Sequence, residues 1–64
     1  MQAPDEVMES LNKDMLRLKM YFPYRIVWAC WCPETGEHYA TATATKHRLN
    51  KLLRQGWSCY VLTI

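Results

Sequence analysis

The chain has 64 residues, half of them apolar, and eight Lys and Arg against six Asp and Glu give a net charge of +2. This length allows one small domain, residues 1–64, and the apolar content is too high for an intrinsically disordered chain. The charge is too small to indicate a polyanion partner by itself. No apolar run approaches the roughly 20 residues that span a bilayer, so no membrane partner is expected.

The compartment is predicted from the first residues and the cysteines. The N-terminal segment carries acids where a secretory signal would carry basic residues. Three cysteines is an odd number, and Cys30 and Cys32 lie too close along one segment to bridge each other easily. Reduced thiols and a cytoplasmic protein are therefore expected.

Residues 4–19 have the periodicity of a helix. Asp5, Glu6 and the later Lys and Arg residues complement the helix dipole, and Pro23 ends the helix. One apolar stripe faces a core and consists of Val7, Met8, Leu11, Met15 and Leu18.

Residues 24–45 predict a β-hairpin. The stretch YRIVWACWC is rich in β-branched and aromatic residues, and PETGE supplies the proline and glycine of a loop of roughly five residues. Strict alternation then continues to Thr45, which suits the N-cap of a short helix over residues 46–55. Gly56 suits its C-terminal cap, and residues 57–64 form a third strand.

The order α-β-β-α-β predicts an α+β fold. A right-handed crossover gives a three-stranded antiparallel sheet of order 2-1-3, with the apolar strand of residues 24–32 at the centre. The second helix packs on one face of this sheet. The first helix has three alternatives: the other face, a position alongside the second helix, or a second copy of the chain.

The alternating alanines decide what each sheet face carries. We expect Cys32 to face His38 across the hairpin loop. One face then pairs Cys30 with Ala40, Trp28 with Ala42 and Ile26 with Ala44. The small methyl groups let the second helix approach with Leu49, Leu52 and Leu53. The opposite face pairs Trp31 with Tyr39, Ala29 with Thr41, Val27 with Thr43 and Arg25 with Thr45.

The second of these faces is the predicted contact surface. An exposed aromatic pair beside an arginine is typical of interface anchors, unless the first helix covers it. The predicted partner-binding residues are Trp31, Tyr39, Arg25, Thr41 and Thr43.

The second helix carries basic residues with no acid among them. Such a stripe could follow nucleic-acid phosphates, or it could be a solvated face that keeps the chain soluble. The residues are Lys46, Arg48, Lys51 and Arg54, with His47 beside them.

Metal binding and catalysis have little support in the sequence. Four residues form a chemically sensible zinc set, although the C-x-C spacing favours buried core thiols instead. They are Cys30, Cys32, His38 and Cys59. The acids suggest no acid/base pair, and there is no glycine-rich phosphate loop, so neither an enzyme nor a cofactor is expected.

Residues 24–53, with the PETG tip leading into a helix, resemble the arm-binding domains of phage-type integrases, which bind DNA. In that family the third strand precedes the hairpin, whereas here it is expected to follow the second helix, and the family's functional residues are not transferred.

The sequence thus predicts a small non-enzymatic protein-binding module. It is similar in kind to accessory proteins of bacteriophages and mobile elements, which act as adaptors or inhibitors of a larger host complex, and self-association into a homodimer is a further expectation. The alternative is a nucleic-acid-binding module that uses the basic helix 46–54 or the threonine face.

Overall fold

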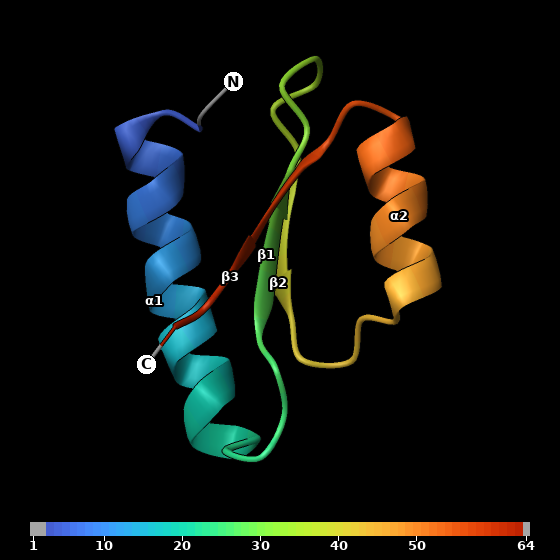
Figure 1. Cartoon of the computed structure of the whole chain (residues 1–64). Coiled ribbons are helices and arrows are strands. Elements are labelled where there is room, and N and C mark those ends of the chain that lie inside the picture. The colour runs from blue at the N-terminus through green and yellow to red at the C-terminus, as the bar shows by residue number, and fades with distance from the viewer. Residues whose placement is uncertain (1–2, 64) are drawn as a thin grey trace.

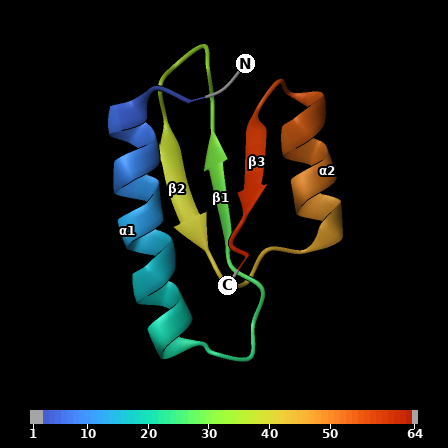
Figure 2. The same cartoon turned by 60° about the vertical axis from the view of Figure 1, so that its left-hand side comes forward.

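A computed structural model, which describes residues 3–63, has two helices on opposite faces of a three-stranded sheet (Figure 1). The elements are α1 (Asp5–Tyr21), β1 (Trp28–Trp31), β2 (His38–Thr41), α2 (Lys46–Arg54) and β3 (Ser58–Val61). The strand order is β2-β1-β3, and both pairs are antiparallel. The predicted α+β fold is therefore confirmed, including the central position of β1 (Figure 2).

Helix α1 packs on the face of the sheet opposite α2, which is the first of its three predicted alternatives (Figure 1). Its buried residues are Leu11 and Met15, and the rest of the predicted stripe packs partly buried around them. The helix begins after Pro4, which is its N-cap, and the Phe22 N–H donates to the Leu18 carbonyl at 2.8 Å just before Pro23. The predicted apolar stripe is thus the one that the fold buries.

The hairpin loop is one residue shorter than predicted. The Cys32 N–H donates to the Glu37 carbonyl at 2.8 Å, and the Gly36 N–H donates to the Cys32 carbonyl at 2.8 Å. Gly36 has φ +78, a left-handed conformation that glycine adopts without a Cβ penalty. This glycine lets the chain reverse within residues 33–36, so that Cys32 lies opposite Glu37 rather than His38.

The shorter loop makes the predicted register wrong by one residue. Trp31 pairs with His38, Cys30 with Tyr39, Ala29 with Ala40 and Trp28 with Thr41. Because side chains alternate along a strand, a shift of one residue moves every β2 side chain to the other face relative to β1. Ala40 consequently packs against the cluster under α1, and Ala42, just beyond β2, belongs to that cluster and also lines the hollow beside Leu49 and Leu53 of α2.

The core between α1 and the sheet takes side chains from alternate positions of β1 and from Val27 just before it. Val27, Ala29 and Trp31 are all at most 4% exposed there. Ala29 and Ala40 lie opposite each other, and their small side chains let α1 approach the sheet closely. These two alanines thus face a helix, as predicted for the alanines of the second strand, but the helix is α1 and not α2.

Helix α2 lies between the predicted capping residues. The Thr45 hydroxyl accepts from the Arg48 N–H at 3.2 Å, which caps α2. Gly56 has φ +90 just beyond the helix, and the Trp57 N–H donates to the Leu52 carbonyl at 3.0 Å. Strand β3 is shorter than the predicted 57–64, and Ile64 lies outside the described residues. It follows α2, which is the departure from the integrase pattern that the sequence indicated.

Replacing Leu11 with alanine should lower the free energy of unfolding by about 2–5 kcal/mol, because it leaves a cavity in the α1 core. Chemical denaturation monitored by tryptophan fluorescence measures this. Leu16→Ala on the same helix is the matched control, since Leu16 is 48% exposed, and its effect should be much smaller. Equal effects of the two substitutions would contradict the packing.

Candidate binding groove

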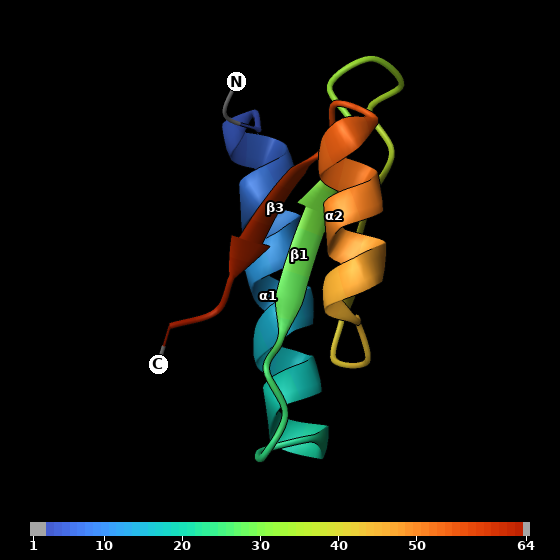
Figure 3. The ribbon, with the colours of Figure 1, turned by 45° about the vertical axis from the view of Figure 1, so that its right-hand side comes forward.

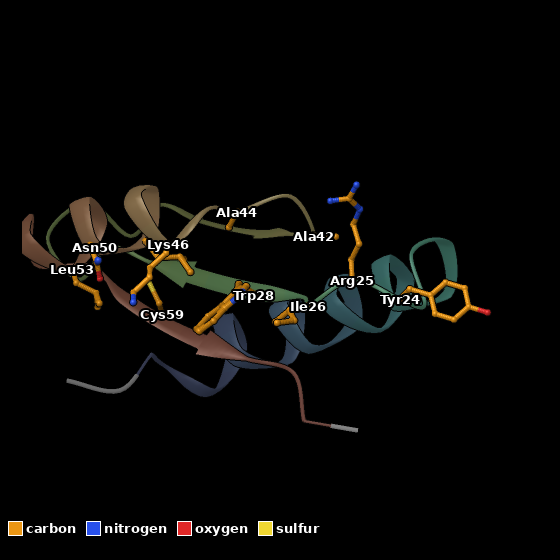
Figure 4. A pocket seen from close by; sticks show the side chains of 11 residues that line it. Tyr24, Arg25, Ile26, Trp28, Ala42, Ala44, Lys46, Asn50, Leu53 and Cys59 are labelled. Carbon is orange, nitrogen blue, oxygen red and sulfur yellow. The ribbon is translucent and has the colours of Figure 1, made fainter.

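A groove lies on the side of the sheet that faces α2 (Figure 4). Its volume is about 690 Å³, and it runs from α2 to the segment that precedes β1. Figure 3 views this face and shows β1 and β3 beside α2 rather than hidden beneath it. The sheet face is thus only partly covered by the helix.

One wall of the groove is α2, whose apolar stripe the chain itself covers poorly. No residue of this helix is buried, and of its leucines Leu49 and Leu52 are half-buried while Leu53 is 53% exposed. Leu49 and Leu53 line the groove together with Lys46 and Asn50. A nine-residue helix with a strongly amphipathic sequence therefore keeps part of its apolar face available.

The floor and the far end of the groove come from β1, β3 and the segment before β1. Trp28 and Cys59 lie on the floor, on the face of the sheet opposite the α1 core. Ile26 is 65% exposed, and Tyr24 is fully exposed at the far end, with its ring pointing away from the sheet in Figure 4. Large apolar side chains that are this exposed and adjacent mark a surface suited to binding.

The groove is lined by cations and by no carboxylate. Arg25 and Lys46 both line it. All six side-chain carboxylates of the chain lie elsewhere: four are in α1, on the opposite face of the sheet, and Glu34 and Glu37 are at the hairpin tip (Figure 1). The two side chains of the groove that are charged at neutral pH are therefore both cations.

The predicted aromatic contact pair does not exist as such. Trp31 is 4% exposed and packs under α1, whereas Tyr39 lies on the other face because of the corrected register. The Tyr39 ring meets the Trp57 ring edge-on at 6.0 Å, and the Arg48 guanidinium lies 6.0 Å from its centroid. The prediction that Trp31 and Tyr39 form one exposed pair is therefore wrong.

The predicted threonine ladder is also replaced by a different arrangement. Thr41 is the last residue of β2 and lies opposite Trp28, on the sheet face that is directed towards α2. Thr43 lies beyond the strand, where its N–H donates to the Thr41 hydroxyl at 3.2 Å. The two hydroxyls thus serve a local turn, and of the predicted contact residues Arg25 alone lines the groove.

The four basic residues of α2 are all exposed. Lys46 lines the groove, and Arg48 lies over Tyr39 on the other side of the helix. Lys51 lines a smaller hollow with Arg48, and Arg54 ends the helix. The positive charge is therefore spread around the helix.

The proposed zinc ligands are not brought together. Within residues 3–63 there is no group of three or more His, Cys, Asp or Glu side chains placed to hold a metal ion. Cys30 and Cys59 are direct partners across β1 and β3, but His38 pairs with Trp31 and so lies on the opposite face from Cys30. The register that separates Trp31 from Tyr39 also separates His38 from these two thiols.

The environments of three groups change their acidity. Hydrogen bonds donated by the Thr35 hydroxyl and backbone lower the pKa of Cys32 at the hairpin tip. Burial raises the pKa of Cys59 to about 12, and the neighbouring Cys30 thiol adds to this. Burial also raises the pKa of Tyr39, which the Arg48 charge partly opposes. Cys59, in the floor of the groove, is thus a neutral thiol at neutral pH.

Comparisons with models of protein families, with curated proteins and with solved structures give no match for this chain. Neither described helix combines the length and apolarity needed to cross a membrane. Function is therefore inferred from the chemistry of the surface.

Sequence reasoning missed most of the groove. It placed Ile26 and Trp28 in a core under α2, and it gave no role to Tyr24 or Asn50, which line the groove. The signal that could have indicated the groove is the shortness of the helix predicted over residues 46–55, which presents only three leucines to the sheet.

The Cys59 thiol predicts a dependence of stability on alkaline pH. Its pKa of about 12 in the folded chain exceeds the value of about 8.5 for an unfolded cysteine, so its stabilising contribution is complete below pH 8.5 and is lost as the pH rises towards 12. Cys59→Ala should therefore make the free energy of unfolding fall less steeply above pH 8.5. Denaturation at a series of pH values measures how steeply the free energy of unfolding falls with pH in the original chain and in the variant. Identical slopes would contradict the raised pKa of Cys59.

Proposed function

We propose that this chain is a small non-enzymatic module that binds another protein through the groove beside α2. The observation that carries the proposal is the incomplete cover of the α2 leucine stripe, which leaves Leu53 and Ile26 more than half exposed around a groove of about 690 Å³. Exposed apolar surface rimmed by charge is typical of protein interfaces. The contact surface is thus the groove and not the predicted Trp31 and Tyr39 pair.

The groove offers binding energy but no apparatus for chemistry. A partner that covers Ile26 and Leu53 removes apolar surface from water, which contributes roughly 25 cal/mol per Å² before the costs of association. Its titratable side chains are Lys46, Arg25, Tyr24 and Cys59, and the Cys59 thiol is protonated at neutral pH. This composition favours an adaptor or inhibitor over an enzyme.

The setting of this function is proposed from the size and the cysteines. A chain of 64 residues with an odd number of cysteines fits a reducing compartment, and we place the interaction in the cytoplasm. Accessory proteins of bacteriophages and mobile elements that modulate a host complex are of this kind, and the chain is proposed to act in the same way.

Substituting Leu53 with aspartate should abolish capture of the partner, because it places a charge in the apolar wall of the groove. Anchors of this type contribute at least about 2 kcal/mol, so the affinity should fall tenfold or more. The measurement is a pull-down from lysate of the native host, run with and without nuclease. Leu16→Asp is the matched control, since Leu16 is about equally exposed but lies on α1. Circular dichroism of both variants verifies that they fold.

The outcome that would contradict the proposal is capture that survives Leu53→Asp but disappears with nuclease. Binding of nucleic acid by the basic residues of α2 would then be the function, and it would weaken steeply with salt. The double substitution of Lys51 and Arg54 with alanine separates the two cases, because neither side chain lines the groove. It should leave protein capture intact and weaken binding to nucleic acid.

A further inference from the structure

The groove exposes a part of the sheet face that α2 does not cover (Figure 3). Three strands span only about 14 Å and one helix is about 10 Å wide, so a helix centred on such a face normally covers it. Here β1 and β3 remain visible beside α2 in Figure 3, and Val61 of β3 is 42% exposed on that face. A second helix lying beside α2 would contact Leu53 on its flank and Trp28 beneath it.

The lining favours contact through side chains rather than strand addition. A peptide that extends a sheet binds through the backbone of an edge strand, and its affinity comes from main-chain hydrogen bonds. The groove instead presents apolar side chains from α2, from the sheet face and from residues 24–26. An amphipathic helix, which presents a continuous apolar stripe, complements such a surface.

Charge decides which amphipathic helix fits. Arg25 and Lys46 line the groove, and every side-chain carboxylate of the chain lies on α1 or at the hairpin tip. A second copy that pairs with this groove about a two-fold axis would bring cations against cations, which is unfavourable. Acidic side chains beside the apolar stripe of a partner would instead meet both cations.

We propose that the groove binds an amphipathic helix of a protein partner, with acidic residues flanking its apolar stripe. This rests on the proposed function and specifies the partner's chemistry. Ile26, Trp28 and Leu53 contact the apolar stripe, and Arg25 and Lys46 contact the acidic residues. The apolar contacts provide most of the affinity, whereas the two cations provide selectivity and fast association.

Three synthetic helical peptides test the proposal. They share one stripe of Leu and Phe at helical spacing, and their flanking positions carry Glu, Gln or Lys. Titration calorimetry at low salt should show the Glu peptide binding about twofold to tenfold tighter than the Gln peptide, and the Lys peptide weakest, since exposed ion pairs contribute little each. The advantage of the Glu peptide should shrink as salt rises.

Variants of the chain assign the selectivity to the groove. The double substitution Arg25→Ala with Lys46→Ala should bring the ratio of Glu to Gln affinities close to one. Lys13→Ala removes an exposed cation from α1 and should leave that ratio unchanged. Leu53→Asp should prevent binding of the Glu and Gln peptides alike.

Three results would overturn the inference while leaving a protein-binding groove. Equal binding of the three peptides, or tightest binding of the Lys peptide, overturns the acidic partner while leaving a protein-binding groove. If none of the three peptides binds, while the pull-down captures a protein that Leu53→Asp releases, then the occupant of the groove is a protein but not a helix. Sedimentation that shows a dimer dissociated by Leu53→Asp identifies a second copy as the occupant and overturns the inference.

Discussion

The turn at Gly36 is the constraint on which the rest of the structure depends. Its left-handed φ lets the chain reverse over residues 33–36, and the hydrogen bond from the Cys32 N–H to the Glu37 carbonyl then fixes the register of β1 with β2. That register places Ala40 beside Ala29 under α1 and Tyr39 beside Cys30 under α2. A loop one residue longer would exchange the two faces of β2 and move Ala40 to the side of α2.

The two helices that follow from this register are unequally packed. Helix α1 buries Leu11 and Met15 against small residues of the sheet, whereas the shorter α2 has no buried residue. Its position depends on the Thr45 cap, on the bonds around Gly56, and on contacts such as that of Arg48 with Tyr39. One face of the sheet is therefore the core of a small domain, and the other is an incompletely filled layer.

The sequence predicted the fold well because its periodicities are long enough to be clear. The apolar stripe of α1, the Thr45 cap and the central position of an apolar β1 all follow from local patterns, and all are confirmed. The register did not follow, because loops of four and five residues both accommodate PETGE and differ only in where Gly36 turns. The wrong register put Tyr39 on the wrong face of the sheet, whereas Trp31 was assigned to the surface because the sequence left the position of α1 open, and α1 covers it.

The cations of the groove oppose the self-association that its exposed apolar side chains favour. A surface that exposes Ile26, Leu53 and Val61 on a small protein favours association of identical chains. Arg25 and Lys46 place two like charges on that surface, so two grooves that meet face to face repel each other. The same cations attract an acidic helix. In the binding mode that we propose, the apolar residues supply affinity and the two cations favour an acidic helix over a second copy of the chain, so this mode requires both kinds of residue.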